Sequence, residues 1–270
     1  MKVLRTIVAA AVTVFGASQA YAQEWTGGYI SGHIGFSKIA EGSDNVILFD
    51  KNLDGDFSDT VNTAAGANAF SPGFCTGSTS SSLAAAGCTV DDDGPDFGGR
   101  VGYDRQSGRF VVGGLIELSA PDHIDSVTAF STTPAFYTFT RELTYVGGLR
   151  ARAGYGGERV LIYGTGGGAW AKIDHSFTTS NAVNTFVEDA DDMAWGYQLG
   201  GGVDLKFGKL TAGAEYLWTS LMDEDRYTVR AQGPAAATNA FILTNPAGTD
   251  FQRADKLEFG VIRFTMGYRF

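Results

Sequence analysis

The sequence has no long apolar run beyond its first twenty residues, so no later segment has the roughly 20 apolar residues that a membrane-spanning helix needs. If the chain enters a membrane, it must therefore do so as a closed β-barrel, because only helices and barrels satisfy every backbone polar group there. Basic residues are also scarce, with 20 Lys and Arg against 30 Asp and Glu, which gives a formal charge of −10. This acidity argues against nucleic acid as a partner, since phosphate binding needs basic patches.

Residues 1–22 are predicted to be a secretory signal peptide. Lys2 and Arg5 precede a short apolar run, and Ala20-Tyr21-Ala22 provides an A-x-A cleavage site. Cleavage after Ala22 leaves residues 23–270 with a formal charge of −12, because it removes Lys2 and Arg5. We therefore expect an exported protein. In an oxidising compartment the only two cysteines, Cys75 and Cys88, are expected to form a disulfide that closes a short loop.

The last stretch, residues 257–270, alternates like a β-strand, in which successive side chains point to opposite faces. Counting back by twos from Phe270 gives an apolar face, and the other face carries Arg263 and Arg269. Seven further segments have a similar length and most share the alternation. The eight expected strands cover residues 25–39, 96–105, 109–119, 141–155, 158–172, 192–207, 209–221 and 257–270.

The connections between these segments alternate strictly between long and short. The long ones span about residues 40–95, 120–140, 173–191 and 222–256, and short Gly-containing turns lie between them. This asymmetry is typical of a small outer-membrane barrel with short periplasmic turns and long external loops. The sequence therefore predicts an all-β fold, an eight-stranded antiparallel up-and-down transmembrane β-barrel formed by residues 23–270.

Charged residues concentrate on the face opposite the apolar one, which should line the barrel interior. An eight-stranded barrel is only wide enough for side chains to fill it, and confined charges must pair. We expect a packed ionic network centred on Arg150, Arg152 and Arg263 with Glu117 and Glu215. The full predicted lumen set is Arg100, Glu117, Arg150, Arg152, Asp204, Glu215 and Arg263.

Aromatic residues near the strand ends are expected to form girdles at the two membrane interfaces. Trp25, Tyr103, Phe110, Tyr155, Phe207 and Phe270 fall near the turns, and Trp170, Trp195 and Trp218 fall near the long loops. The segment 158–172 cannot be assigned to faces, because Trp170 is out of phase with Leu161 and Tyr163.

Several pieces of the framework resemble the small Gram-negative outer-membrane barrels of the OmpA-barrel and opacity type, and most closely the outer-membrane immunogenic porin-like group. The pieces are WTGGYISGHIG, FGGRVGYDRQSGRFVVGGLIEL, LRARAGY, GTGGGAWA, WGYQLGGGVDL, AGAEYLW and the C-terminal phenylalanine. The resemblance implies an eight-stranded barrel, surface or envelope roles, and assembly by the outer-membrane insertion machinery, with Phe270 as part of the signal. It supplies no catalytic residues.

One loop motif suggests a metal ion. Asp50, Asn52, Asp54, Asp56 and Asp59 follow the start of a calcium loop, and Gly55 would permit its sharp turn. The bidentate glutamate expected at position twelve is missing, because Val61 stands there. Calcium in the first long loop is therefore a hypothesis, with a solvated acidic loop as the alternative. Divalent ions bridging this loop to lipopolysaccharide are a related possibility.

Two motifs suggest enzymes and lack the necessary context. Gly164 to Ala169 match the dinucleotide pattern G-x-G-x-x-A, but no helical period follows to present its N-terminus to a pyrophosphate. His123 and Ser126 share a loop without a clear acidic orienter. We therefore expect a non-enzymatic outer-membrane protein without a cofactor, with an envelope-integrity and surface-interaction role. Outer-membrane lipids, lipopolysaccharide and surface or host ligands of the loops are the expected partners. The alternatives are a narrow porin and a soluble lipocalin-like barrel.

Overall fold

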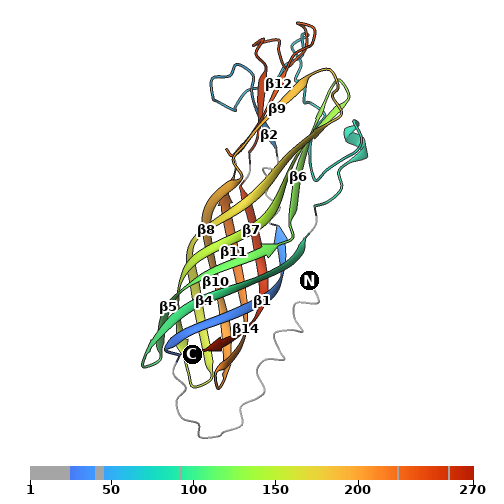
Figure 1. Ribbon diagram of the computed structural model, residues 1–270. Helices are drawn as coiled ribbons and strands as arrows, with labels where there is room; N and C mark the ends of the chain where they lie inside the picture. The colour runs from blue at the N-terminus through green and yellow to red at the C-terminus, as the bar shows by residue number, and fades with distance from the viewer. Residues whose placement is uncertain (1–24, 40–45, 92, 224, 255) are drawn as a thin grey trace.

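The computed structural model describes residues 25–39, 46–91, 93–223, 225–254 and 256–270. The predicted signal peptide lies outside this range, as do the loop acids Glu41, Asp44 and Asp92. In the described residues no helix has the length and apolarity to span a membrane, and the one helical turn is η2 (Ala84–Ala86). The described chain is otherwise built from β-strands and their connections (Figure 1).

Eight long strands close into a barrel (Figure 1). They are β1 (Gly27–Ile39), β4 (Gly94–Ser107), β5 (Phe110–Pro121), β7 (Ala135–Gly156), β8 (Val160–Thr179), β10 (Met193–Phe207), β11 (Leu210–Met222) and β14 (Leu257–Arg269). Their order is β7-β5-β4-β1-β14-β11-β10-β8, every pair is antiparallel, and β7 pairs with β8 to close the ring. The predicted fold is confirmed, because each expected segment coincides with one of these strands.

The three short connections lie at one end of the barrel, which we call the turn end. Gly108 and Gly208 have φ of 60° and 65° there, a backbone conformation that glycine adopts without steric cost. The opposite end, from which the long connections emerge, is called the loop end. The strict alternation of long and short connections in the sequence thus corresponds to the two ends of one barrel.

The long connections were expected only as polar loops, and this expectation was incomplete. They contain β2 (Ile47–Asp50), β3 (Gly73–Thr76), β6 (Ile124–Ser131), β9 (Thr185–Ala190), β12 (Tyr227–Gln232) and β13 (Thr249–Arg253). Strands β2, β13, β12 and β9 form a separate four-stranded sheet, while β6 pairs with the outer part of β7 and β3 pairs with β6. We call these strands, with the loop-end parts of β7 and β8, the distal domain (Figure 1).

The distal domain has its own apolar core. Phe70 and Phe251 lie at its centre with Tyr137, and their ring centroids are 5.4 to 6.1 Å apart. The first, second and fourth long connections contribute buried side chains to this core, and Phe177 and Phe186 of the third pack against it partly buried. The connections are therefore ordered by burial of apolar surface against one another, and not only by the barrel.

A β-bulge separates the distal part of β7 from its barrel part. The pairing with β8 shifts register between Leu143 and Tyr145, so Leu143 points inward and Tyr145 does not. In the expected strand 141–155 an unbroken period of two puts Leu143 and Tyr145 on the same outward face as Leu149, and for Leu143 this is wrong. An inserted residue reverses the period of two, so the side chains before a bulge point to the opposite face.

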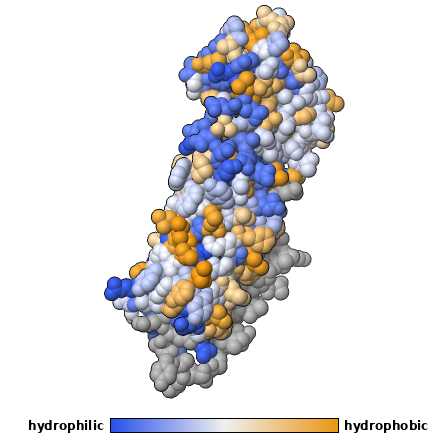
Figure 2. Space-filling view, in the orientation of Figure 1, coloured by the Kyte–Doolittle hydropathy of each residue, from blue (hydrophilic) through white to orange (hydrophobic). Residues whose placement is uncertain are grey.

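Apolar side chains cover the outside of the barrel, and the predicted facing of the last strand is confirmed. On β14, Ile262, Phe264 and Met266 are more than half exposed, whereas Arg263 is 1% exposed. On β8, the strand without a predicted facing, Leu161 and Tyr163 point inward and Ile162 points outward. Apolar atoms lie over the barrel in Figure 2, with hydrophilic atoms above them.

Candidate functional site

The lumen holds a central cluster of buried charges. The Glu117 carboxylate on β5 accepts from Arg150 at 2.7 Å and from Arg263 at 2.5 Å. The Glu215 carboxylate on β11 accepts from Arg100 at 2.7 Å and from Arg150 at 3.3 Å. Five of the seven predicted lumen residues therefore meet in one cluster, and none of the five is more than 4% exposed.

Three further side chains complete this cluster and were not predicted. Asp96 accepts from Arg263 Nε at 2.8 Å and lies 3.1 Å from His33 Nε2. The Tyr163 hydroxyl donates to Glu215 at 2.8 Å. Asp96 lies four residues before Arg100 on the same strand, so the two side chains point to the same face. The alternation of the strand could therefore have predicted Asp96 as a lumen residue. Tyr163 was missed because Trp170 is out of phase with it, which left the faces of β8 unassigned; in the structure Tyr163 points inward and Trp170 lies on the opposite parity.

Arg152 and Asp204 were predicted as members of a single lumen network, and they form a second cluster nearer the turn end. Arg152 Nε donates to Asp104 at 2.8 Å, and Arg152 Nη1 lies 3.1 Å from Asp204. Arg269 reaches the same Asp104 carboxylate at 2.9 Å. Arg152 is two residues from Arg150 on β7, about 6.6 Å along the strand at ~3.3 Å per residue, which puts it one layer lower in the lumen.

Trp25 was expected in an interfacial girdle, and this was wrong because its side chain is fully buried at the turn end of the lumen. Its Nε1 donates to the Gly157 carbonyl at 3.0 Å, and its backbone amide donates to Gln106 Oε1 at 2.7 Å. The Arg269 guanidinium lies 5.4 Å from its ring centroid, a cation–π distance. Trp25 thus closes the turn end from inside. The other aromatics expected near the turns, Tyr103, Phe110, Tyr155, Phe207 and Phe270, are exposed as expected.

An apolar layer fills the lumen between the central cluster and the loop end. It consists of Leu143, Val146, Ala169, Ala171, Ile173, Ala194, Leu221, Leu257, Phe259 and Val261. The lumen is thus occupied along the barrel by two ionic clusters and one apolar layer.

A third ionic cluster joins the barrel mouth to the distal domain. Arg141 on β7 donates to Asp125 on β6 at 3.1 Å and lies 3.3 Å from Asp223, just after β11. Arg253 at the end of β13 lies 3.1 Å from the same Asp125 carboxylate. His175 Nε2 on β8 lies 3.3 Å from Asp223. Residues from three long connections are thereby fixed at the mouth.

Asp125 in this cluster and Asp91 beside it have pKa values shifted in opposite directions. Burial by itself would raise the pKa of Asp125, but Arg141 and Arg253 outweigh it and hold that pKa below its ordinary value. Burial raises the pKa of Asp91 to about 6, although the Ser126 amide bound to it opposes the rise and the Asp125 charge adds to it. Asp91 is therefore the carboxyl of this pair that titrates near neutral pH.

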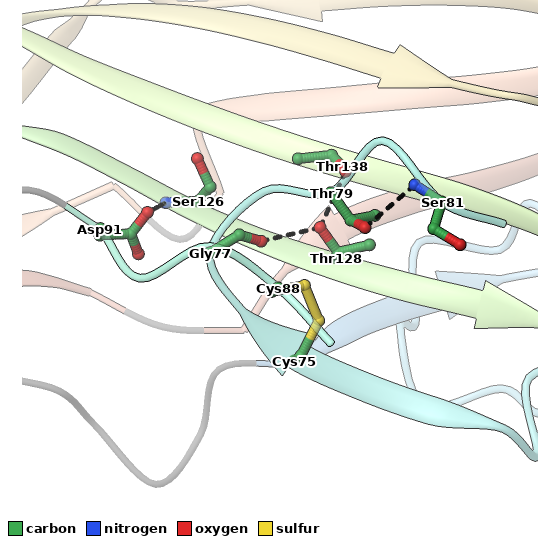
Figure 3. The surroundings of a disulfide bond; sticks show 9 residues. All are labelled: Cys75, Gly77, Thr79, Ser81, Cys88, Asp91, Ser126, Thr128 and Thr138. Carbon is green, nitrogen blue, oxygen red and sulfur yellow. Dashed lines mark hydrogen bonds between the residues drawn. A yellow bond between two sulfur atoms is a disulfide. The ribbon is translucent and has the colours of Figure 1, made fainter. Parts of the chain in front are cut away.

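The predicted disulfide between Cys75 and Cys88 is confirmed, with the two Cα atoms 6.1 Å apart (Figure 3). Cys75 lies on β3, and the segment after Cys88 returns along β6. There the Ser126 amide donates to Asp91 at 3.0 Å, and Thr128 Oγ1 donates to the Gly77 carbonyl at 2.8 Å. The disulfide thus closes a loop that is held against β6 on both sides.

The five residues of the calcium hypothesis lie at the end of β2 and in the segment that follows it, residues 50–59. Asp50 is buried, and its carboxylate accepts from the backbone amides of Leu53, Asp54 and Gly55. Asp59 accepts from the Lys51 amide at 3.0 Å. Among the residues that the structure describes, no three His, Cys, Asp or Glu side chains are grouped to hold a metal ion. Calcium remains a prediction, which hydrogen exchange of residues 50–59 would contradict if millimolar calcium left it unchanged.

Each histidine is packed into one of the buried regions. His33 contacts Asp96, His175 stacks on Tyr227 with centroids 5.0 Å apart, and His123 Nε2 forms a short contact with Ser37 Oγ. Ser126, the serine near His123 in sequence, instead contacts Thr140 Oγ1 at 3.0 Å. Ser37 is fully buried, so a substrate could not reach the His123 contact without opening the barrel mouth.

Two solved protein structures align with most of this chain at low sequence identity. In the solved structure of OprG from Pseudomonas aeruginosa, 98% of that chain aligns with 91% of this one, with 13% identity and a TM-score of 0.49. Ail of Yersinia pestis, solved with the heparin analogue sucrose octasulfate, aligns over 99% of its chain and 90% of this one, with 13% identity and a TM-score of 0.36.

Sequence relatives are known for one part of the chain. The 31 kDa outer-membrane immunogenic proteins of Brucella melitensis and Brucella suis are 33% identical over 82 residues, which is 30% of this chain and 34% of theirs. The chain thus matches about a third of the length of these relatives. The family model described as outer membrane protein beta-barrel domain matches residues 7–270. The chain belongs to this family of Gram-negative outer-membrane β-barrel proteins, so its turn end is periplasmic and its loop end external.

Proposed function

We propose that the protein is a sealed, non-enzymatic barrel that supports envelope integrity and displays the distal domain outside the cell. The observation that carries this proposal is the filled lumen. Glu117 and Glu215 together hold Arg100, Arg150 and Arg263, and Asp104 with Asp204 holds Arg152. An unpaired charge in such a buried site has a high free energy. These side chains should therefore stay paired and keep the lumen closed, which does not suit a path for ions.

Planar-bilayer recordings of the purified full chain test the sealed lumen. We expect no reproducible unitary openings from the wild-type protein. A Glu117→Ala/Arg150→Ala double variant removes a central pair and serves as the comparison for a loosened lumen. Glu158→Ala, which removes an exposed carboxylate at the turn end, is the matched control. Stable, reproducible openings of the wild-type protein would support the narrow porin instead.

Envelope support is proposed from the barrel wall and its surroundings. The outward face is apolar along every barrel strand, which anchors the protein among lipid chains, and the acidic residues above it suit divalent-cation bridges to lipopolysaccharide phosphates. Deleting the gene should raise sensitivity to detergents and large antibiotics, and the wild-type gene should restore resistance. A deletion strain with unchanged permeability would contradict this role.

The insertion machinery is the proposed assembly partner, with Phe270 as part of its signal. The Phe270 side chain is 74% exposed, and its amide donates to the Gly28 carbonyl at 3.0 Å. Its ring therefore contributes little to the folded core. Deleting Phe270 should lower the amount of barrel in the outer membrane while leaving refolding in detergent unaffected. Equal amounts in the membrane would contradict the signal.

A further inference from the structure

Two glycines interrupt the apolar outer wall of the barrel. Gly32 on β1 and Gly99 on β4 are cross-strand partners, and both are exposed on the outward face. Their neighbours in the same row are Met266 on β14 and Leu118 on β5, which are 72% and 56% exposed. Two adjacent positions without side chains thus lie between two projecting apolar side chains. At this point the wall is hollowed into a groove of about 830 Å³, which we call the wall groove.

The wall groove extends toward both ends of the barrel. Leu210 and Tyr268, a cross-strand pair beside the turn between β10 and β11, line it at the turn end. Trp170 lines it at the other end, toward the long connections. A Cβ added at Gly147 would overlap the Trp170 ring, so this glycine lets the indole lie against the wall next to Leu118. The groove therefore crosses the apolar band between the two aromatic girdles.

The lining of the wall groove suits a hydrocarbon chain. Ser31, Arg100 and Glu117 also border it, but their side chains are buried in the lumen and only their backbone faces outward. Lipid chains are as apolar as the outward side chains, so the hydrophobic effect alone selects no occupant. Packing does, because side chains beside an empty space lose dispersion contacts and a flexible chain that fills the space restores them. In an outer-membrane barrel the molecules that supply such chains are lipids.

A lysine marks the turn end of the wall groove. The Lys209 ammonium lies 5.6 Å from the centre of the Tyr268 ring, and Lys209 is exposed. A lysine whose stem lies along apolar surface near a membrane interface places its ammonium among the lipid headgroups. Tyr268 thus lines the groove and also contacts the cation. A lipid whose acyl chain occupies the groove would bring its phosphate to Lys209.

The turn end as a whole is basic, although the chain has a formal charge of −10. The exposed bases in or beside the three short turns are Arg105, Arg109, Arg159 and Lys209. Among the residues described at this end, Glu158 is the only exposed carboxylate side chain, because Asp104 and Asp204 are buried in the second ionic cluster. Basic residues at a membrane surface attract anionic lipids. An anionic headgroup is therefore favoured here over a zwitterionic one.

We propose that the wall groove binds an anionic phospholipid of the periplasmic leaflet, with one acyl chain along Gly32 and Gly99 and the phosphate at Lys209. Lipopolysaccharide also carries acyl chains and phosphates, but it lies in the outer leaflet and its phosphates would be at the loop end. The exposed Lys172 at that end is already paired with Asp174. The position of the cation therefore selects the phospholipid.

Native mass spectrometry of the full chain, refolded in detergent, tests the headgroup. Equal amounts of phosphatidylglycerol, phosphatidylethanolamine and lipid A are added. The wild-type protein should retain one phosphatidylglycerol at least fivefold more often than either of the others. Lys209→Gln should lose this preference. Arg109→Gln removes a base that lies in the same way over a girdle tyrosine, 5.7 Å from the Tyr155 ring centre, and should keep it.

A pair of leucine variants tests the groove itself. Gly32→Leu with Gly99→Leu fills the groove, and a Cβ at either glycine would have no neighbour closer than 3.6 Å, so the barrel should fold. Retention of phosphatidylglycerol should fall at least tenfold. Gly164→Leu with Gly168→Leu adds the same side chains to the outward face of β8, where a Cβ is equally free, and should bind like wild type. The heat-dependent gel shift shows that each variant is folded.

A phosphatidylglycerol with a photoreactive diazirine in one acyl chain locates the site without any variant. In vesicles the label should concentrate on peptides from β1, β4 and β14. Four results would each overturn the proposal: even labelling around the barrel, no preference for phosphatidylglycerol in the wild type, unchanged binding in either test variant, or stronger retention of lipid A. None of these measurements depends on whether the lumen conducts or on what the distal domain contacts.

Discussion

Arg150 on β7 and Glu117 on β5 meet inside the barrel with 2.7 Å between Nη2 and Oε2, and neither side chain is more than 2% exposed. Glu117 also holds Arg263. Removing the carboxylate would leave two buried guanidinium groups short of a partner.

Glu117→Ala should therefore lower the free energy of unfolding by about 3–5 kcal/mol, the cost of breaking a buried ion pair from one side. Urea unfolding in phospholipid vesicles measures this loss. Glu158→Ala removes an exposed carboxylate from the same barrel and should change the stability little. An equal loss in the two variants would show that the lumen cluster does not stabilise the barrel.

Truncating the buried tryptophan at the turn end should also destabilise the barrel. Trp25→Ala empties the space between Gly157 and Arg269, and large aromatic truncations in a core cost about 3–5 kcal/mol. Phe207→Ala removes an exposed aromatic side chain at the same end and should lower the free energy of unfolding less. Urea unfolding in phospholipid vesicles measures the free energy of unfolding of both variants. A Trp25→Ala barrel as stable as the Phe207→Ala barrel would contradict the inward role of Trp25.

Two glycines on neighbouring strands should respond differently to alanine. A Cβ at Gly202 would lie 2.6 Å from the Ala214 carbonyl and 2.7 Å from the Tyr163 hydroxyl, whereas a Cβ at Gly168 meets nothing within 4 Å. Gly202→Ala should lower the free energy of unfolding by about 1–3 kcal/mol, as expected for overpacking. Gly168→Ala should leave it nearly unchanged. The heat-dependent gel shift and urea midpoint check this pair. A reversed order would contradict the inward facing of Tyr163.

The pH dependence of the disulfide loop should follow Asp91. Its pKa in the folded protein is about 6, above the ordinary 3.8, so the folded state binds its proton more tightly than the unfolded state does. The docked loop should therefore lose stability as pH rises from about 4 to about 6 and gain it as pH falls through that range. After correction for intrinsic rates, amides near Asp91 and Ser126 should exchange more slowly at pH 5 than at pH 7.5.

Asp91→Asn keeps the shape and removes the titrating group, so the difference between the two pH values should disappear in that variant. Asp125 does not complicate this range, because its pKa is held below the ordinary value and it stays ionised throughout. A pH dependence that persists in Asp91→Asn would assign the effect to another group.

The barrel could be predicted from the sequence because its strands repeat with a period of two and its connections alternate in length. Arg100, Arg150 and Arg263 were identified as lumen residues from that period alone. The distal domain could not be predicted in this way. Its sheet pairs β2 with β13 and β9 with β12, and such contacts between distant segments leave no local periodic signal.

The remaining errors have separate physical causes. The bulge between Leu143 and Tyr145 reversed the facing of the residues before it. The facing of β8 stayed open because its inward residues Leu161 and Tyr163 are as apolar as Trp170, which lies on the opposite parity. Trp25 was assigned to the interfacial girdle because it lies near a strand end. A tryptophan at that position can either face the membrane interface or fill the end of the lumen, and the sequence does not distinguish the two. The mouth cluster of Arg141, Asp125 and Asp223 was missed since its members lie in or beside polar connections.

The interlocking of the four long connections also determines what an antibody raised against the purified folded protein would contact. Antibodies against the folded surface would contact residues from several connections at once, since Thr132 binds beside Ala69 and Asn184 beside Gln232. Peptides copied from single connections would present only parts of such epitopes. An antigen intended to elicit antibodies against the native surface would therefore need to keep the barrel as its scaffold.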